Sequence, residues 1–177
     1  YIGGYVVSHV SETYDGKVLL TDTGNDVALL YDGESLTEVY RVTSSSPSQN
    51  ITGCAMIRDG TIMCYDRVTG KAWIVRDGLE TEVSIPFTTF VTPSENYDKF
   101  YATTVDGVYE VYADGSFSKI VDSENILRYL VLSTGEKVYS DGSLHVVVGS
   151  EEKFTVKPRV SSVIHASRYS MYMTPTK

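Results

Sequence analysis

Short runs of apolar and β-branched residues recur along the whole chain, each separated from the next by a glycine-containing turn signal. Examples are "KVLLTD" (17–22), "DVALLY" (26–31), "TIMCYD" (61–66), "KAWIV" (71–75) and "LHVVV" (144–148). Such compositions and lengths are typical of β-strands. No stretch shows a convincing helical period, so the pattern predicts an all-β protein.

The stretch "VYEVYADGSFSKIV" (108–121) shows the recurring device most clearly, with Asp-Gly between two alternating runs. Both central residues of a two-residue type I′ turn need positive φ. Asp-Gly favours this turn because glycine adopts positive φ freely and aspartate tolerates it. With Asp114-Gly115 at the tip, Tyr112 is expected opposite Phe117, Glu110 opposite Lys119 and Val108 opposite Val121. Aromatic, opposite-charge and β-branched pairs all stabilise an antiparallel ladder.

The turn signals also repeat at a longer period. "DGKVLLTDTGNDVALLYDGESLTEV" (15–39) aligns with "DGTIMCYDRVTGKAWIVRDGLETEV" (59–83), an offset of about 44 residues that is typical of a four-stranded propeller blade. One domain over 1–177 is expected, with repeat units at roughly 1–49, 50–93, 94–123 and 124–177. The predicted fold is an irregular β-propeller of about four blades or a propeller fragment. A β-sandwich of hairpins is the alternative, although it needs no such period.

The third unit does not fit this pattern cleanly. It has one strand too few, and Asp114-Gly115 falls between its second and third strands instead of at an outer turn. If the strands of a blade are called A to D, the short Asp-Gly turns of the first two units are A–B and C–D connections. The longer polar loops are B–C and D–A connections and are expected together on the opposite rim: 21–26, 43–50, 66–71 and 89–98.

Composition argues against two classes of partner, nucleic acids and membranes. The net charge is −8 and the basic residues are scattered, whereas nucleic-acid binding needs a concentrated basic face. No apolar run is long enough to cross a bilayer, so no membrane insertion is expected.

Cys54 and Cys64 flank Asp59-Gly60. A two-residue turn there would place the cysteines on opposite faces of the sheet, where they cannot bond, and two free buried thiols are then expected. A bulged or three-residue turn would shift the register and could bring them together.

Catalytic chemistry has no clear signature. His9, His145 and His165 are far apart in the sequence, and none lies near a plausible nucleophile and acid. The loop "DTGND" (22–26) offers oxygen ligands for calcium, but these are ordinary turn residues. No sequence pattern identifies the two carboxylates that glycoside hydrolysis would need. No catalytic residue, metal or cofactor is therefore expected.

Blade length and turn placement resemble those of degenerate β-propellers, although the Gly-His and Trp-Asp signature and the Gly-Gly doublet of named blades are missing. "DRVTGKAW" (66–73) comes close to the Asp box of sialidases, with its Asp two positions early. The Tyr-Asp-Gly hairpins and low lysine content also resemble bacteriophage tail, fibre and other virion modules. That resemblance implies a structural or attachment role in an extracellular or virion location.

The predicted function is a non-enzymatic, structural or receptor-binding module that presents its rim loops to a protein or glycan, as a homo-oligomer or part of a larger assembly. A carbohydrate-active, sialidase-like propeller enzyme is the alternative. The residues expected to contact the partner are polar or aromatic residues of the four loops: Asp22, Asn25, Asp26, Gln49, Asn50, Asp66, Arg67, Lys71, Glu95, Asn96 and Tyr97.

Overall fold

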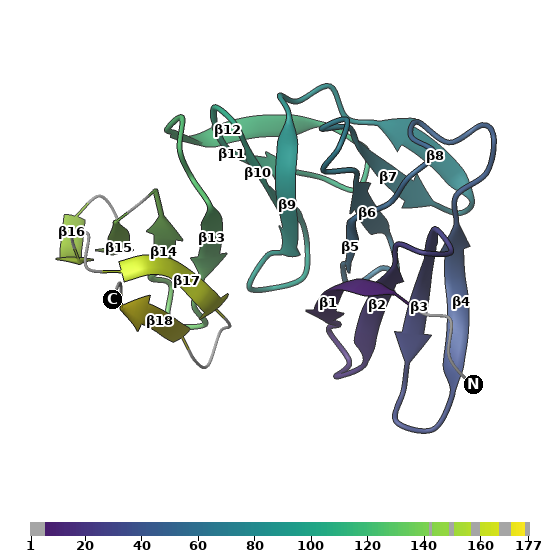
Figure 1. Ribbon diagram of the computed structural model, residues 1–177, viewed down its shortest axis with the longest axis horizontal. Helices are drawn as coiled ribbons and strands as arrows, with labels where there is room; N and C mark the ends of the chain where they lie inside the picture. The colour runs from purple at the N-terminus through teal and green to yellow at the C-terminus, as the bar shows by residue number, and fades with distance from the viewer. Residues whose placement is uncertain (1–5, 142, 149–150, 157–159, 167–170, 176–177) are drawn as a thin grey trace.

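The computed structural model describes residues 6–141, 143–148, 151–156, 160–166 and 171–175, and all of the regular structure in these ranges is β-strand. Four four-stranded antiparallel sheets follow one another along the chain, each a simple meander, and a two-stranded sheet comes last. The sheets are arranged in an arc like the blades of a propeller (Figure 1). The predicted all-β propeller architecture is confirmed, and the sandwich alternative is wrong.

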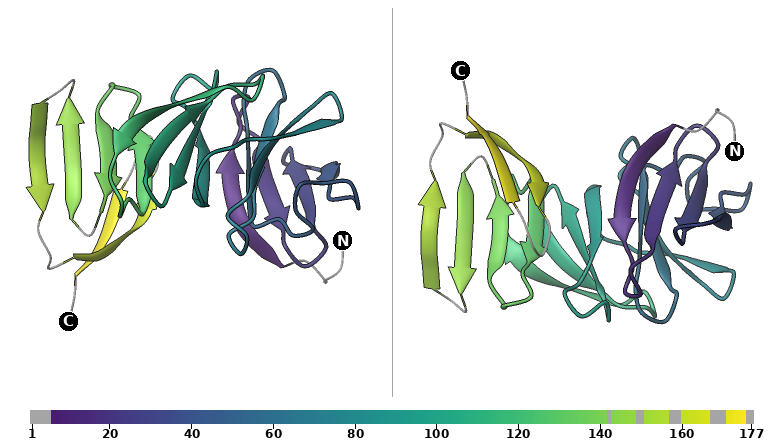
Figure 2. Two further views of the ribbon diagram at one scale, coloured as in Figure 1. Left: turned by 90° about the horizontal axis from the view of Figure 1, so that it is seen from above. Right: turned by 90° about the horizontal axis from the view of Figure 1, so that it is seen from below.

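Within each blade, the first strand lies on the inside of the arc and each successive strand lies farther out (Figures 1 and 2). Blade 1 comprises β1 (Val7–Glu12), β2 (Val18–Asp22), β3 (Val27–Tyr31) and β4 (Leu36–Arg41). Blade 2 comprises β5 (Gly53–Met56), β6 (Ile62–Tyr65), β7 (Ala72–Arg76) and β8 (Leu79–Glu82). Blade 3 comprises β9 (Thr88–Pro93), β10 (Phe100–Thr104), β11 (Gly107–Val111) and β12 (Phe117–Asp122). Blade 4 comprises β13 (Arg128–Val131), β14 (Lys137–Ser140), β15 (Leu144–Val148) and β16 (Glu151–Val156), and the final sheet comprises β17 (Val160–Ala166) and β18 (Met171–Pro175).

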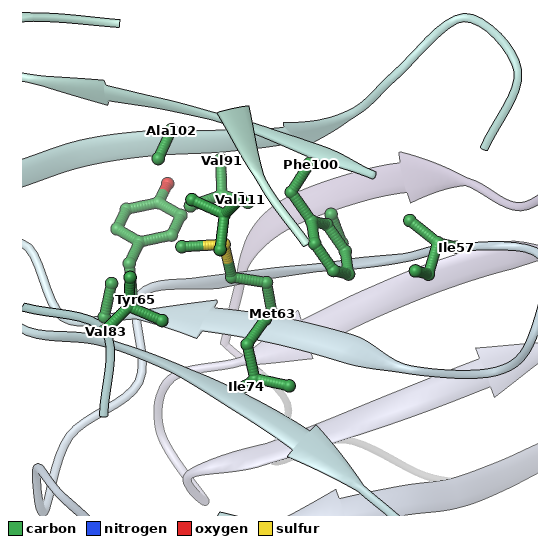
Figure 3. Close-up of a cluster of buried hydrophobic side chains, with 11 residues drawn as sticks. Ile57, Met63, Tyr65, Ile74, Val83, Val91, Phe100, Ala102 and Val111 are labelled. Atoms are coloured by element: carbon green, nitrogen blue, oxygen red, sulfur yellow. The ribbon is translucent and has the colours of Figure 1, made fainter. Parts of the chain in front are cut away.

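Blade 2 shows why its strands are apolar on both faces. Successive side chains on β6 point to opposite sides of the sheet. Met63 and Tyr65 join the core shared with blade 3, whereas Ile62 and Cys64 join the core shared with blade 1. Figure 3 shows the first of these cores, in which Met63 lies among side chains from both blades. Both cores bury their apolar surface between sheets, which stabilises the stacking of the blades.

The third blade corrects the sequence-based interpretation. Residues 89–98 are predicted to be a rim loop, but β9 includes residues 89–93 and pairs with β10 as strand A of blade 3. The blade therefore has four strands, and Asp114-Gly115 lies at its C–D turn, as the first two blades require. The threonine, phenylalanine and valine residues of "TTFVTP" (88–93) are typical of a strand, but Pro93 at its end and Ser94 after it are typical of a loop.

The tight turns also differ from the two-residue turns predicted. In blade 2, Ile57 N–H donates to the Thr61 carbonyl (3.0 Å) and Gly60 N–H donates to the Ile57 carbonyl (3.0 Å), which closes a three-residue loop. Gly60 is the last loop residue and has a φ of 88°, a conformation that suits glycine. Equivalent loops occur at residues 14–16, 113–115 and 133–135. The extra residue moves the register by one position.

That shift changes several predicted contacts. In blade 3, Val108 faces Val121 as predicted, but a bulge follows, so Glu110 lies opposite Ser118 and Val111 lies opposite Phe117. The predicted Tyr112–Phe117 and Glu110–Lys119 pairs are therefore wrong. Cys54 and Cys64 face each other directly, so the expectation that they point to opposite faces is also wrong.

The two rims of the molecule are held by separate contacts. The A–B and C–D connections form the turn rim, where Arg58 N–H donates to the Tyr97 carbonyl (2.7 Å) and so joins blades 2 and 3. The B–C and D–A connections form the loop rim, where the Ser48 hydroxyl donates to the Asp66 carboxylate (2.6 Å). Loops 21–26, 43–50 and 66–71 lie on the loop rim as predicted, because they are B–C and D–A connections.

Candidate functional site

The innermost strands bring four positions together near the loop rim. His9 of β1, Gly53 of β5, Phe90 of β9 and Arg128 of β13 all lie early in an inner strand. The His9 and Phe90 rings are stacked with centroids 4.8 Å apart, and the Arg128 guanidinium lies 4.2 Å from the Phe90 ring centroid. This arrangement is a cation–π contact backed by a second ring.

Gly53 makes room for this cluster. A Cβ atom at position 53 would lie 1.9 Å from His9 Nδ1 and 2.6 Å from Tyr65 Cε1. The His9 ring and the Tyr65 ring therefore occupy the space that any other side chain would need. Tyr65 comes from β6 of blade 2, and its ring centroid lies 5.8 Å from that of His9.

Arg128 supplies the charge of the cluster. Its side chain donates a hydrogen bond to the Leu127 carbonyl (2.7 Å), and among the described residues no carboxylate forms an ion pair with either Arg128 or Arg67. Burial lowers the pKa of Arg128, and the positive charge of Arg67 lowers it further. Two arginines without acidic partners thus act on one another in a chain of net charge −8.

The neighbouring ionisable groups are neutral at pH 7. Burial lowers the pKa of His9 to about 4, and the charge of Arg128 lowers it further. Burial also raises the pKa of Tyr65 to about 12. The potential at this end of the inner strands is therefore set by the arginines.

A cavity of about 360 Å³ opens on the same rim between blades 3 and 4. It is lined by Thr89, Thr104, Val105, Glu124, Asn125, Ile126, Leu127 and Asp141. Thr89 directly precedes Phe90 and Leu127 directly precedes Arg128, so the lining of the cavity is adjacent in sequence to both residues of the cation–π contact. Its size suits a small group of a larger ligand.

Exposed apolar side chains lie on the same rim. Val68 is 80% exposed and follows Arg67 in the B–C loop of blade 2. In the described connections of the loop rim, the other exposed large apolar residues are Val6, Phe87, Val105 and Leu127. The loop rim therefore combines apolar surface with uncompensated positive charge.

Two predicted contact residues serve the loops themselves. The Asp22 carboxylate accepts hydrogen bonds from the backbone N–H groups of Val6 and Gly24 (both 3.0 Å) and from the Asn25 amide (2.6 Å). The Asp66 carboxylate accepts bonds from Ser48, Thr69 and the Val68 N–H. Burial tends to raise the pKa of each carboxyl, but these hydrogen bonds outweigh it and lower the pKa.

The remaining loop-rim candidates differ in availability. Asp26 accepts a bond from the Ile51 N–H (3.3 Å), and the Lys71 ammonium donates to the Pro47 carbonyl (3.1 Å). The exposed candidates at this rim are Asn25, Gln49, Asn50, Arg67 and Lys71. Gln49 donates to the Thr43 carbonyl (3.2 Å), whereas no side-chain hydrogen bond of Arg67 is seen among the described residues.

The last three candidates lie on the opposite rim. Glu95, Asn96 and Tyr97 belong to the A–B turn of blade 3, because β9 ends at Pro93 and β10 begins at Phe100. Tyr97 is buried against Tyr14, with ring centroids 5.9 Å apart, and Glu95 accepts a hydrogen bond from the Tyr101 hydroxyl (2.6 Å). The prediction that these residues share a rim with Arg67 was wrong.

Sequence reasoning missed Arg128, His9 and Phe90. Each is a single residue in an ordinary strand pattern, and they meet only because inner strands of different blades lie side by side. A usable signal was the position of each residue near the start of a strand A, which the misplaced third blade concealed.

Meandering four-stranded sheets with the inner strands around a common centre define a β-propeller fold, and comparison with solved structures agrees. Virginiamycin B lyase from Staphylococcus aureus is 14% identical, with a TM-score of 0.61 over 85% of this chain and 55% of that chain. A gluconolactonase from Xanthomonas campestris is 10% identical, with a TM-score of 0.69 over 96% of this chain and 69% of that chain. The WD40 propeller domain of Doa1 is 12% identical, with a TM-score of 0.63 over 92% of this chain and 57% of that chain.

These likenesses show the fold alone, since the identities are low and the neighbours include both enzymes and other proteins. The chain spans about 55% of the length of the virginiamycin B lyase. No family model matches the sequence, and no curated protein matches it. The resemblance to virion modules receives no support from these comparisons. Within the described residues, no helix is long and apolar enough to span a membrane.

Proposed function

We propose that this protein is a non-enzymatic binding module whose loop rim docks an acidic segment of a partner protein. The proposal depends on a combination of two features on one rim. Arg67 and Arg128 have no acidic partner among the described residues, and exposed apolar side chains such as Val68 lie on the same rim. Arginine and apolar residues are characteristic of protein interfaces.

The charge argument identifies the chemistry of the ligand. A half-buried guanidinium without a counter-charge is costly, and a carboxylate that binds it forms a strong, charge-assisted pair. Arg128 is held in place by the Phe90 ring, whereas Arg67 is exposed and can close on the ligand. An acidic glycan has the same charge but would make less use of the apolar surface.

Binding to defined polymers tests the proposal. The unaltered chain is expected to bind a copolymer of glutamate and tyrosine more tightly than polyglutamate or polygalacturonate, as measured by calorimetric titration. Arg67→Ala should weaken binding of the copolymer by about tenfold or more, which is typical for loss of a charge-assisted hydrogen bond. Val68→Ser should weaken binding of the copolymer and leave polyglutamate binding nearly unchanged.

Arg76→Ala provides the matched control. Arg76 ends β7 at the C–D turn of blade 2, where it pairs with Asp59 (3.8 Å), so its loss removes the same charge on the opposite rim. Equal binding by the unaltered chain and Arg67→Ala would contradict the proposal. A preference for polygalacturonate over the copolymer would assign the rim to acidic glycans instead.

A second candidate is a carbohydrate-active enzyme, favoured by the presence of Glu124 and Asp141 in the wall of one cavity. Burial tends to raise the pKa of Asp141, but hydrogen bonds from His145 and the Ser143 N–H outweigh it and lower the pKa. Asp141 would thus act as the ionised member of a carboxylate pair. A glycan-hydrolysis screen distinguishes the two functions: turnover that is lost in both Glu124→Gln and Asp141→Asn would replace the binding proposal.

A further inference from the structure

Cys54 and Cys64 form a facing pair in the interior of the molecule. They are direct partners in the register of β5 and β6, and their Sγ atoms lie 2.7 Å apart. Both are free thiols, and both are fully buried. The three-residue loop 58–60 creates this register, since a two-residue turn would place the two side chains on opposite faces.

The surroundings of the pair are apolar. Both cysteines belong to the core between blades 1 and 2, and Cys64 lies opposite Trp73 on the next strand. Burial raises the pKa of the Cys64 thiol, so Cys64 is a poor nucleophile in the folded protein. Across the described part of the chain, no group of three His, Cys, Asp or Glu side chains could hold a metal ion, so the pair belongs to no such site.

We propose that Cys54 and Cys64 are a modification site at which a disulfide bond joins β5 to β6. Facing residues on adjacent strands satisfy the short Cα and Cβ separations that a disulfide needs, and the sulfurs already lie within reach of the bonding distance of about 2.05 Å. The bond would cross-link the two inner strands of blade 2, which pack against both neighbouring blades.

The oxidant is a small-molecule disulfide such as oxidised glutathione. One cysteine, as its thiolate, attacks this disulfide, forms a mixed disulfide and releases one glutathione thiolate. The second cysteine thiolate then attacks the protein sulfur of the mixed disulfide, which forms the Cys54–Cys64 bond and releases the second glutathione. The protein loses two protons and two electrons, and the glutathione disulfide gains the electrons. Because both sulfurs are fully buried, this exchange takes place before blades 1 and 2 have packed together.

Refolding with and without oxidant tests the bond directly. The unaltered chain is unfolded, refolded in a buffer of oxidised and reduced glutathione or in a reducing buffer, unfolded again with an alkylating agent and weighed by mass spectrometry. After oxidative refolding the chain should take up no alkyl group and be lighter by the mass of two hydrogen atoms. Its melting temperature should exceed that of the reduced protein by roughly 5 °C.

The contrary outcomes are equally clear. Uptake of two alkyl groups after oxidative refolding, or disulfide-linked dimers in place of the intramolecular bond, would overturn the proposal. The mass measurement uses the unaltered chain, so it does not depend on whether a variant folds. In the Cys54→Ala and Cys64→Ala double variant, the melting temperature should be the same in both buffers. A difference that persists in this variant would also contradict the proposal.

Discussion

At the scale of single residues, chemical type alone did not separate functional side chains from structural ones. Asp22 and Asp66 are the acidic residues one would choose for ligand contact, yet both are fully buried. Their carboxylates accept hydrogen bonds from backbone N–H groups of the loops in which they lie. Arg67 follows Asp66 in the chain and is exposed. Which of two adjacent polar residues faces the solvent depends on the loop conformation.

Gly53→Ala tests the close packing of the inner strands. The added Cβ would overlap His9 Nδ1 and Tyr65 Cε1, so we expect the free energy of unfolding to fall by roughly 1–3 kcal/mol, measured by denaturant titration. In a double-mutant cycle with His9→Ser, the cost of the alanine should shrink, because the nearest atom is gone. Strict additivity of the two changes would show that His9 is not the obstacle.

His9 also predicts a pH dependence. Its pKa is lowered to about 4 in the folded protein, so between pH 6.5 and 4 the unfolded chain binds a proton that the folded chain does not. Stability should therefore fall as the pH falls through this window, by about 3 kcal/mol at most from this group. His9→Phe should remove this share of the pH dependence in denaturant titrations. An unchanged pH profile in the variant would contradict the assignment.

At the scale of elements, the turns decided more than the strands. Strand compositions identified most strands, but turn length set which residues face one another. Asp77-Gly78 closes a two-residue turn, with both residues at positive φ, as the Asp-Gly signal predicts. Asp59-Gly60 occupies a three-residue loop instead. The same dipeptide suits both geometries, because glycine adopts positive φ in each and aspartate tolerates positive φ in the two-residue turn.

Asp66→Ala tests how much one side chain contributes to the B–C loop of blade 2. Loss of the carboxylate leaves the Ser48 hydroxyl and the Val68 N–H without their acceptor, so we expect a destabilisation of about 1–3 kcal/mol. Thermal unfolding measures the change. Asp122→Ala is the control, since the Asp122 side chain is 90% exposed and its loss should cost little.

Blade 4 contains a histidine, His145, whose pKa is shifted in the opposite direction to that of His9. His145 lies between Asp141 (Nε2 to Oδ1, 2.8 Å) and Glu152 (Nδ1 to Oε1, 2.5 Å), and its ring is stacked on Tyr139. Burial tends to lower its pKa, but the hydrogen bonds to both carboxylates outweigh it and raise the pKa. The stability that it contributes is thus fully present below pH 6.5 and is lost as the pH rises through the folded pKa.

Nuclear magnetic resonance titration of the His145 ring measures this effect. The pKa should lie above 6.5 in the unaltered protein and decrease in Glu152→Gln, which keeps the shape but removes one charge. A pKa that does not respond to this substitution would exclude Glu152 as a cause. His9 in the same spectra serves as the internal reference, since its pKa should remain low.

At the scale of the whole molecule, the charge distribution is uneven. The chain carries a net charge of −8, yet the arginines at the loop rim have no acidic partner among the residues described. Such a local positive region in an acidic protein can select an acidic partner that the rest of the surface repels. The proposed binding should therefore depend on both attraction at the rim and repulsion elsewhere.

Salt separates the ionic part of binding from the apolar part. As the ionic strength rises from about 0.01 M to 1 M, the Debye length falls from about 30 Å to 3 Å. Affinity for the glutamate–tyrosine copolymer should decrease over this range, and the decrease should be smaller in Arg67→Ala than in the unaltered chain. Calorimetric titrations at several salt concentrations measure the slopes. Parallel slopes would mean that Arg67 makes no ionic contact with the ligand.

The all-β class, the blade repeat and the position of three rim loops followed from the sequence alone, because strand composition and glycine turns are local properties of the chain. The cation–π contact of Arg128 and Phe90, the fit of His9 over Gly53 and the facing of Cys54 and Cys64 followed only from the tertiary structure. Each depends on the register within a blade or on the packing of one blade against the next. A single extra turn residue changes the register, and residues about 40 positions apart meet only when the blades stack, so neither outcome is encoded in any short stretch of sequence.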